Sequence, residues 1–348
     1  MNISVTNACN RRCEYCFQKD WYLAKKTFKD SQNSDVVEMS TEEFGQLCKW
    51  SSNMPVLKLM GGEPLLHSEL FTLIDIAKDH NKELTFISNI SIATEKFAEF
   101  CKKISEEGSP VRSFLVNSDY PKAQKETFIS NFEQLCKCNV GIAISTTMMP
   151  NLHEVDKAIT RIEPLIERYK KIRNDIGSLR LRISPNTPNP VKPQEFQNAD
   201  FTDGTLKLIT SLKSKGLERF NFDCQVNCCE LWSEAVDEFR RDNSIIRTLR
   251  CCPATGMPFD VLVDHSVVWC SSANFLRLDD WRKYPSFKEA RNALEDMYYK
   301  WWETHKENEQ CTNCEQRICG RCQGFCIAKT NAFEQSRTEK KKTMPIIG

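Results

Sequence analysis

Residues 1 to about 225 predict an α/β fold in which helices cover a parallel sheet. Short β-rich runs alternate there with amphipathic helical segments, as expected for repeated strand–helix–strand units. Six or so repeats favour a closed or partly closed β/α barrel over an open doubly wound sheet, although periodicity alone does not separate the two. In such a barrel the functional groups lie at the carboxyl ends of the strands.

The individual elements follow from local patterns. The expected strands are 2–6, 55–60, 83–88, 112–117, 140–146, 178–184 and 218–223, which are rich in β-branched and aromatic residues. The expected helices are 41–52, 68–80, 93–104, 125–137, 154–172 and 203–215, where apolar residues recur at helical spacing. The Ser-Thr-Glu-Glu sequence at 40–43 is typical of a helix cap.

The chain changes character after the barrel. The Pro- and Asn-rich stretch 184–200 predicts an extended loop, and the region from Cys224 onward lacks clear strand–helix alternation. A hairpin is expected at 259–270. We therefore expect a barrel domain at 1–223, a cysteine-rich domain at 224–335 and a mobile tail at 336–348.

Composition argues against several kinds of partner. Lys and Arg total 48 against 47 Asp and Glu, so no excess of positive charge indicates nucleic acid or an anionic membrane as the main partner. The N-terminus lacks the pattern of a signal peptide, and no apolar run approaches the length of a membrane helix. These features predict a cytoplasmic globular enzyme.

Cysteine content is the unusual feature. The chain has 18 cysteines, and without a secretion signal they are expected to be reduced and available to ligate metal. Three lie near the N-terminus and eleven lie from Cys224 onward. Cys48, Cys101, Cys136 and Cys138 fall in apolar segments, where buried small hydrophobic residues are expected.

The sequence CNRRCEYC places Cys9, Cys13 and Cys16 directly after the first expected strand. Three thiolates at this spacing can hold three irons of a 4Fe–4S cluster and leave the fourth iron open to a non-protein ligand. Three alternatives remain open: a structural zinc site completed by a distant ligand, a ferredoxin-type cluster completed by a fourth cysteine, and unligated thiols.

With aromatic Tyr15 just before Cys16, this pattern resembles the signature of the radical S-adenosylmethionine (radical SAM) enzymes. The resemblance implies a 4Fe–4S cluster whose open iron is chelated by the amine and carboxylate of SAM. It also implies electron transfer that cleaves SAM to methionine and a 5′-deoxyadenosyl radical, which abstracts hydrogen from the substrate.

Residues at later strand ends resemble the family's SAM contacts. The sequence Gly61-Gly62-Glu63-Pro64 resembles the motif whose backbone and carboxylate meet the SAM amino group, where glycines let the backbone approach closely. Ser88 and Asn89 resemble the Thr-Asn-Gly element that contacts ribose or methionine, with Ile90 in place of glycine.

Three further polar residues, Asn117, Ser118 and Arg182, also lie at strand ends, where they are either SAM contacts or ordinary rim residues. The resemblance thus implies a set of cofactor-binding residues: Tyr15, Gly61, Gly62, Glu63, Pro64, Ser88, Asn89, Ser118 and Arg182. No catalytic acid or base can be named from the sequence.

The C-terminal third resembles the SPASM domain, which carries one or two auxiliary 4Fe–4S clusters. Cys252 and Cys270 fit the first ligands of that pattern, with His265 at its glycine position. The last cysteines are compressed into one run with spacings x2, x4, x2 and x3, where the family has x2, x5, x3 and one cysteine further downstream. The expected auxiliary ligands are Cys229, Cys252, Cys270, Cys311, Cys314, Cys319, Cys322 and Cys326.

We expect two auxiliary clusters. One cluster with zinc or spare thiols is the alternative, and the run from Cys311 is also compatible with a zinc knuckle. The roles of Cys224, Cys228 and Cys251 stay undecided.

The combined resemblance implies a radical SAM oxidoreductase that modifies a peptide or protein side chain by crosslinking or oxidation, as in the maturation of ribosomally synthesised peptides. A one-electron donor of the flavodoxin or ferredoxin type is then expected. Many such maturases carry a leader-binding domain before the barrel. Because the first expected strand begins at residue 2 or 3, we expect a peptide leader to bind the barrel surface, the SPASM surface or a separate protein.

Two other functions remain open. The alternative enzyme is a small-molecule dehydrogenase or epimerase of the sugar or cyclitol type that uses the same radical. The alternative outside catalysis is an iron–sulfur or zinc binding module with a decayed barrel, which the intact CNRRCEYC and GGEP motifs argue against.

Overall fold

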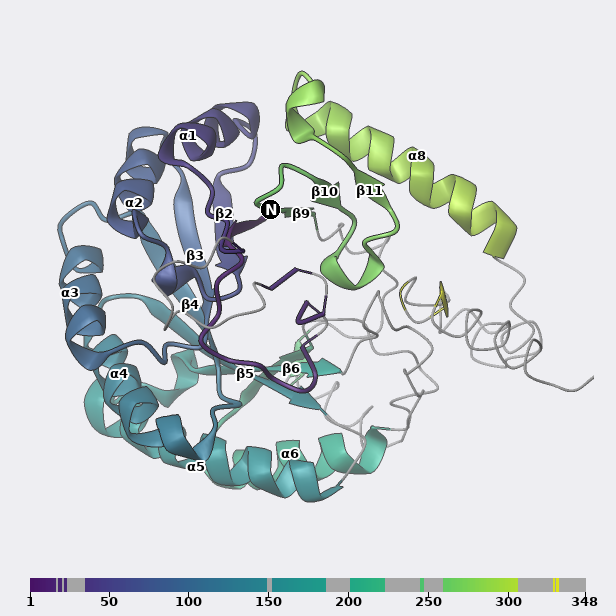
Figure 1. The fold of residues 1–348 in the computed structure, drawn as a ribbon. Helices are drawn as coiled ribbons and strands as arrows, with labels where there is room; N and C mark the ends of the chain where they lie inside the picture. Colours follow the sequence, from purple (N-terminus) through teal and green to yellow (C-terminus); the bar gives the residue numbers. More distant parts are fainter. Residues whose placement is uncertain are drawn as a thin grey trace, which may run out of the picture.

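A computed structural model describes residues 1–16, 18–20, 22–23, 35–148, 152–185, 201–222, 245–246, 259–305, 328 and 330–331. Within these residues an 11-stranded sheet has the order β11-β10-β9-β1-β2-β3-β4-β5-β6-β7-β8. From β1 to β8, each strand pairs in parallel with the next strand of the chain. Helices α1 to α6 form an outer layer around this curved sheet (Figure 1).

The strands are β1 (Asn2–Thr6), β2 (Val56–Gly61), β3 (Glu83–Ser88), β4 (Val111–Asn117), β5 (Gly141–Met148), β6 (Arg180–Pro185), β7 (Arg219–Phe222), β8 (Ile245–Ile246), β9 (Asp260–Val261), β10 (Val267–Val268) and β11 (Arg277–Leu278). The helices are α1 (Thr41–Trp50), α2 (Leu70–Asp79), α3 (Thr94–Ile104), α4 (Lys125–Lys137), α5 (Leu152–Arg173), α6 (Thr202–Ser214) and α8 (Phe287–His305). Short 3₁₀ helices are η1 (Pro64–Leu66), η2 (Lys122–Gln124), η3 (Ile176–Ser178), η6 (Ser271–Ala273) and η7 (Trp281–Lys283).

The expected α/β barrel organisation is confirmed. Each strand and helix predicted for the first 225 residues is present, with ends that shift by at most two residues. Because strand order follows chain order without a reversal, the sheet is not doubly wound. In the described residues the edge of β1 that does not face β2 pairs with β9 rather than with β8. Strand pairing therefore does not close the ring between β1 and β8.

Helix α1 shows how local sequence sets an element. The Ser40 hydroxyl accepts a hydrogen bond from the Glu43 N–H at 3.2 Å, and the Glu43 carboxylate accepts one from the Ser40 N–H at 3.1 Å. This reciprocal capping box satisfies two donors that a helix start otherwise leaves unpaired. Phe44, Leu47 and Cys48 lie on the buried face that packs on the sheet.

The core lies between the sheet and the helices and is rich in phenylalanine. Phe86 of β3 stacks on Phe114 of β4 with ring centroids 5.1 Å apart, and Phe100 of α3 meets it edge-on at 5.4 Å. Such pairs contribute roughly 0.5–1.5 kcal/mol each beyond the burial of their area. The four cysteines expected in the core are buried there: Cys48, Cys101, Cys136 and Cys138.

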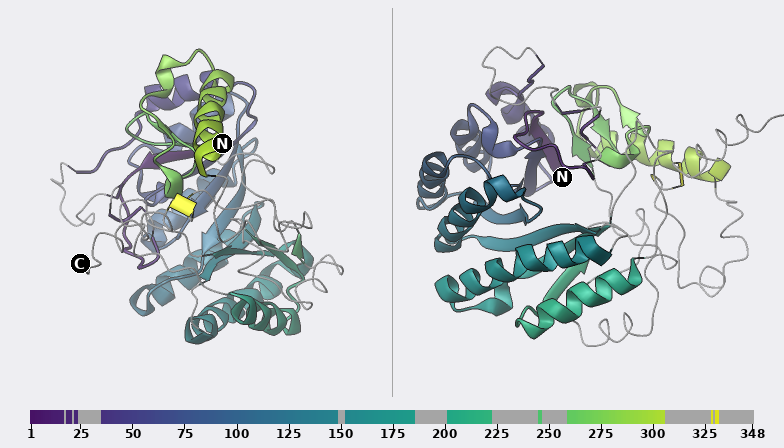
Figure 2. Two further views of the ribbon diagram at one scale, coloured as in Figure 1. Left: turned by 90° about the vertical axis from the view of Figure 1, so that its right-hand side faces the viewer. Right: turned by 60° about the horizontal axis from the view of Figure 1, so that its bottom comes forward.

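The C-terminal region extends the same sheet. The expected hairpin is confirmed, because β9 and β10 pair antiparallel, and β9 also pairs in parallel with β1. Figure 2 shows from two further sides that this green segment lies against the N-terminal strand. Trp269 is buried and stacks on Tyr298 of α8, with ring centroids 4.5 Å apart. Aromatic residues of α8 hold this helix to the hairpin.

Several predictions fall on residues that the structure does not describe. They are most of the loop 184–200, the tail 336–348 and all expected auxiliary ligands except Cys270. Among the described helices, none combines the length and the apolar character needed to cross a membrane.

Candidate active site

The carboxyl ends of the parallel strands bring the sequence motifs to one edge of the sheet. The loop with Cys9, Cys13 and Cys16 follows β1 directly and runs across the strand ends (Figure 1). Its turns are held by hydrogen bonds from Cys16 N–H to the Cys13 carbonyl at 3.1 Å and from Lys19 N–H to the Cys16 carbonyl at 3.3 Å. All three cysteines are partly exposed, and none of them forms a disulfide bond with a described residue.

The three thiols lie close to one another and to the C-terminal hairpin. Cys9 and Cys16 pack against a small apolar cluster made by Tyr22, Leu23, Leu262, Val263 and Val268. Burial raises the pKa of the Cys9 thiol to about 12, and the neighbouring Glu63, Cys16 and Cys13 add to that rise. The hairpin therefore covers one side of the cysteine loop.

Gly61 and Gly62 form a close backbone approach between the ends of β1 and β2. Gly62 N–H donates to the Thr6 carbonyl at 2.8 Å, and Glu63 N–H donates to the Ala8 carbonyl at 2.7 Å. A Cβ on Gly61 would lie 2.2 Å from the Thr6 carbonyl oxygen, and a Cβ on Gly62 would lie 2.0 Å from that of Ala8. Only glycine fits, so the turn fixes the backbone next to Cys9.

The Glu63 carboxylate is buried and joins the ends of β2 and β3. It accepts hydrogen bonds from the Ser88 hydroxyl at 2.7 Å, the Asn89 N–H at 2.7 Å and the Leu65 N–H at 3.1 Å. Burial raises the pKa of this carboxyl, and the three donors oppose the rise. The side chain thus positions the loop at 88–89 in addition to any contact with a ligand.

Asn89 ties that loop to the cysteine loop. Its amide donates to the Asn10 side-chain oxygen at 2.9 Å, and the Asn10 amide donates to the Ser91 carbonyl at 2.7 Å. The Asn89 side-chain oxygen accepts from the Ser91 N–H at 2.9 Å. Asn10 lies next to Cys9, so these bonds hold the first cysteine against the end of β3.

Ile90 occupies the position where the family element has glycine, and it adopts the conformation that glycine favours. Its φ is +44°, a left-handed value that is unusual for a β-branched residue. The buried Asn131 side chain of α4 donates to the carbonyls of Ile90 at 2.7 Å and Ile92 at 2.9 Å. The Ile90 side chain is fully buried, and this burial offsets the backbone strain.

Arg11 lies in the cysteine loop and was not singled out from the sequence. It is only 6% exposed. Its Nε donates to the Gln124 side-chain oxygen at 3.0 Å and its Nη2 to the Asn89 carbonyl at 3.2 Å and to the Ser91 hydroxyl. Burial lowers the pKa of the guanidinium, while the nearby Cys13 and Glu63 favour its charged form. A buried cation therefore lies beside the cysteines.

Tyr15 extends from the same loop towards the end of β4. Its hydroxyl donates to the Asn117 side-chain oxygen at 3.3 Å and lies beside the Asp119 carboxyl. Asp119 is buried and pairs with Arg161 of α5 at 3.0 Å. Burial raises the pKa of Asp119, and Arg161 opposes this. Asn117 was expected at this rim, whereas Asp119 and Arg161 were not recognised.

The two remaining expected rim residues lie further along the sheet. The Ser118 hydroxyl is fully buried and donates to the Ser145 carbonyl at 2.9 Å, which joins β4 to β5. Arg182 of β6 lies in register between Ser145 of β5 and Asn221 of β7. The structure therefore groups Tyr15, Gly61, Gly62, Glu63, Ser88 and Asn89 with the cysteine loop more closely than Ser118 or Arg182.

Comparison with known families identifies the barrel. Residues 3–162, which include the cysteine loop, the Gly61–Glu63 turn and Asn89, match the radical SAM superfamily. These residues form a radical SAM domain.

Proteins similar to this chain carry names that indicate different reactions. The radical SAM cyclopropyl synthase TigE of Paramaledivibacter caminithermalis is 23% identical over 350 residues, which is 94% of this chain and 67% of that protein. A protein named "probable GTP 3′,8-cyclase" from Methanocaldococcus jannaschii is 34% identical over 201 residues, which is 53% of this chain and 63% of that protein.

A solved structure shares the fold. Streptococcus suis SuiB, crystallised with the precursor peptide SuiA, matches with a TM-score of 0.53 and 11% identity over 79% of this chain. The chain spans 59% of the length of SuiB. At this identity the likeness establishes the fold alone.

The radical SAM family implies a 4Fe–4S cluster and SAM, and the residues at this site fit an anionic iron–sulfur cluster. In the described part of the chain, Arg11 Nη1 is buried without a hydrogen-bond partner, and no Asp or Glu forms an ion pair with the guanidinium. No three His, Cys, Asp or Glu side chains among the described residues are grouped to hold a single metal ion. A four-iron cluster makes a different demand, because each thiolate binds a different iron.

Cys270 lies at the end of the hairpin, close to the cysteine loop of the radical SAM domain. The neighbouring Ser271 donates from its N–H and its hydroxyl to the buried Asp260 carboxylate, and the Gln18 amide donates to the Ser271 hydroxyl at 3.3 Å. Ser271 thereby joins the end of the hairpin to Gln18, which lies two residues after Cys16. The other expected auxiliary ligands lie outside the described residues: Cys229, Cys252, Cys311, Cys314, Cys319, Cys322 and Cys326.

Proposed function

We propose that this radical SAM protein holds a 4Fe–4S cluster on Cys9, Cys13 and Cys16 and oxidatively modifies a side chain of a peptide or protein. The single observation that carries the proposal is the convergence of the cysteine loop, the glycine turn and the loop at 88–91 on one edge of the sheet. When bound, the cluster would supply the electron that cleaves SAM to a 5′-deoxyadenosyl radical.

The chain's own residues give that edge its shape. Gly61 and Gly62 leave their backbone groups close to the first cysteine, because no side chain intervenes. Glu63 fixes Ser88 and Asn89, and Asn89 fixes the loop through Asn10. The hairpin covers Cys9 and Cys16 and excludes water from that side.

These contacts support a set of SAM-binding residues that stays a proposal: Tyr15, Gly61, Gly62, Glu63, Pro64, Ser88, Asn89, Ser118 and Arg182. The backbone at Gly61 and Gly62 is the strongest part of it, since its close approach to Thr6 and Ala8 places it beside the start of the cysteine loop. Ser88 and Asn89 already bond within the protein, so we propose that they meet SAM with their remaining hydrogen-bonding capacity.

A peptide substrate is supported by the fold of SuiB, whose crystal structure contains a precursor peptide, and by similarity to TigE over 94% of this chain. A nucleotide or another small molecule is the second candidate, because a relative at 34% identity is named as a GTP cyclase. That similarity covers 53% of the chain, whereas TigE matches into the cysteine-rich region that follows the barrel.

The proposal includes auxiliary clusters and partners. We propose two auxiliary 4Fe–4S clusters held by the cysteines from Cys229 onward, with one cluster as the alternative. A flavodoxin or ferredoxin would donate the electron in the cytoplasm.

The first test is the iron and acid-labile sulfide content of the anaerobically reconstituted protein. We expect about twelve irons per chain, falling to about eight when Cys9, Cys13 and Cys16 are all replaced by Ala. A fall from about eight to about four would indicate a single auxiliary cluster. Replacing the buried Cys48 and Cys136 by Ala is the matched control and should leave the iron content unchanged. Equal iron in the triple variant and the wild type would refute the N-terminal cluster.

The substrate class needs a separate measurement. Under a strong reductant the wild type should release 5′-deoxyadenosine from SAM, and the triple cysteine variant should not. A candidate precursor peptide should then lose two hydrogens per crosslink by mass spectrometry. Turnover of a nucleotide or sugar, with no change in any peptide tested, would favour the second candidate.

A further inference from the structure

Arg11 is a buried cation that forms no ion pair with any Asp or Glu in the described part of the chain, although the Glu63 carboxyl lies nearby. Arginine is rarely buried unless it is paired, because removing the charge from water is costly. Arg11 is 6% exposed, and its described partners are neutral: Gln124, the Asn89 carbonyl and the Ser91 hydroxyl. Its guanidinium carbon also lies 5.7 Å from the centre of the Phe128 ring.

The one guanidinium nitrogen left over is Nη1. It is buried and has no hydrogen-bond partner among the described residues. The groups nearest to the charge include the thiols of Cys13 and Cys9 and the carboxyl of Glu63. The Glu63 oxygens bond Ser88, Asn89 and Leu65 instead of Arg11. A negatively charged group bound at the neighbouring cysteines would therefore supply Arg11 with a partner that the described residues do not give it.

An iron–sulfur cluster held by three thiolates carries net negative charge, which increases by one on reduction. A fixed neighbouring cation stabilises the reduced form more than the oxidised form, and net charge is one of the factors that set cluster potentials. We infer that Arg11 is the counter-charge of the N-terminal cluster and raises its reduction potential. This inference rests on the proposed cluster at Cys9, Cys13 and Cys16.

The hydrogen bonds explain why the cation stays in place. Arg11 is anchored to η2 through Gln124 and to the loop after β3 through Asn89 and Ser91, so its guanidinium is held in one position. At an effective dielectric constant of about 20, a unit charge roughly 10 Å from the cluster changes the reduction equilibrium about tenfold. A tenfold change corresponds to about 59 mV for a one-electron couple.

The chain provides a matched control in the same motif. Arg12 is the next residue and carries the same charge, but it is exposed, so water screens it. We expect Arg11→Gln to lower the midpoint potential of the N-terminal cluster by an amount that corresponds to an about tenfold smaller equilibrium constant for reduction. The measurement is a redox titration followed by electron paramagnetic resonance. Arg11→Lys should retain most of the wild-type potential, and Arg12→Gln should leave it unchanged.

A second variant tests the inference without altering Arg11. Gln124→Glu keeps the acceptor of Arg11 Nε and places a negative charge beside the guanidinium, so it should also lower the potential. This variant keeps the test decisive if Arg11→Gln fails to take up the cluster.

Three results separate this inference from the proposed function. Full iron content with an unchanged potential in both Arg11→Gln and Gln124→Glu would overturn the role of Arg11 while leaving the cluster in place. A potential shift that appears only after SAM is added would also overturn it, because the guanidinium would then pair with the SAM carboxylate. Failure of the N-terminal cysteines to bind iron would instead refute the proposed function.

Discussion

At the residue scale, Gly62 shows how strongly one position constrains the site. A Cβ there would lie 2.0 Å from the carbonyl oxygen and 2.5 Å from the carbonyl carbon of Ala8, and neither backbone atom can rotate away. We expect Gly62→Ala to cost about 3 kcal/mol of folding stability, the upper end of the usual range for overpacking. The shift should displace the loop at Cys9, so iron content should fall as well.

Gly45 provides the control for this prediction. It lies inside α1, where an added Cβ would be 3.8 Å from Ile76 Cγ2, an ordinary contact. Gly45→Ala should therefore stabilise the protein by about 0.5–1 kcal/mol through helix propensity. Thermal unfolding and iron analysis of both variants check the pair. A Gly62→Ala protein with wild-type Tm and iron would show that the approach of the two backbones is looser than the structure indicates.

The limits of sequence interpretation are also clearest at this scale. The three cysteines and the glycines could be recognised because their chemistry depends on local spacing. Arg11, Asn131 and Asp119 could not, because their roles come from contacts with residues far along the chain: Ser91 is 80 positions from Arg11, Ile90 is 41 from Asn131 and Arg161 is 42 from Asp119. The burial of Arg11 inside the cysteine motif, which gives this residue its role, becomes known only from the structure.

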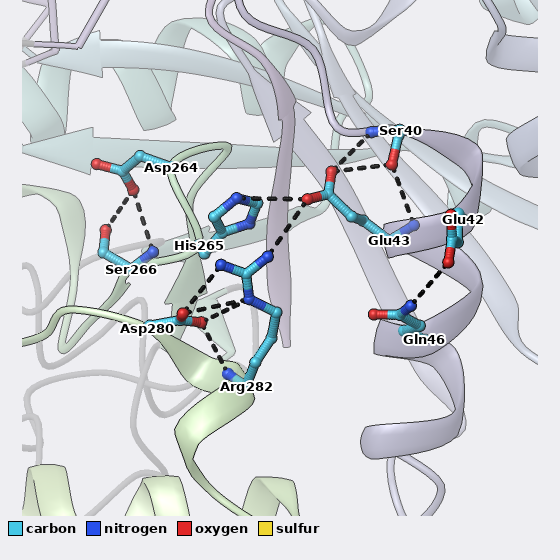
Figure 3. Close-up of polar contacts among 9 residues, drawn as sticks. All are labelled: Ser40, Glu42, Glu43, Gln46, Asp264, His265, Ser266, Asp280 and Arg282. Atoms are coloured by element: carbon cyan, nitrogen blue, oxygen red, sulfur yellow. Dashed lines mark hydrogen bonds and ion pairs between the residues drawn. The ribbon is translucent and has the colours of Figure 1, made fainter.

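At the element scale, the turn between β9 and β10 explains a departure from the SPASM pattern that the sequence resembles. His265 stands where that pattern has glycine, and its φ of +69° is the left-handed value that glycine favours. In the structure the imidazole Nε2 lies 3.3 Å from the Glu43 carboxylate of α1, which also faces Arg282 at 3.7 Å (Figure 3). The side chain therefore joins the hairpin to the barrel helix.

Substitution of His265 separates backbone strain from the contact with Glu43. His265→Ala keeps the strained backbone and loses the contact, so it should destabilise the protein by about 1 kcal/mol. His265→Gly also loses the contact but relieves a strain of about 1–2 kcal/mol, so its free energy of unfolding should equal or exceed that of the wild type. Urea unfolding of both variants gives the order. Equal stability of the Ala and Gly variants would mean that the turn carries no strain.

Glu43→Gln provides the control from the other side of the contact. Glutamine preserves the capping box with Ser40, so helix α1 should keep its N-terminal cap while the charge facing His265 and Arg282 is lost. Because both partners are partly exposed, the expected loss is only a few tenths to 1 kcal/mol.

At the scale of the whole molecule, the C-terminal hairpin completes the barrel edge and covers the cysteine loop at the same time. Sequence alternation predicted the strands β1 to β7 because each repeat is local. It did not predict that β9 pairs with β1, since two residues of strand more than 250 positions away carry no periodic signal. Asp260 is the buried group that holds this pairing together.

Asp260 therefore tests whether the two regions protect the cluster jointly. Its carboxylate accepts from the Asn2 amide at 2.7 Å, the Ser271 N–H at 2.9 Å and the Ser271 hydroxyl at 2.7 Å. Asp260→Asn places an N–H₂ group opposite donors and should cost about 1–3 kcal/mol. Since the hairpin packs on Cys9 and Cys16, its loosening should also expose the thiols.

The measurement is the rate at which the iron–sulfur absorbance bleaches in air, together with limited proteolysis of the C-terminal region. Both rates should rise in Asp260→Asn and stay at the wild-type level in Asp279→Asn, an exposed aspartate close to the same hairpin. Faster proteolysis without faster bleaching would show that the hairpin docks through Asp260 but does not shield the cluster. The protection would then come from the barrel loops alone, and Asn89, Asn10 and Arg11 would be the next residues to vary.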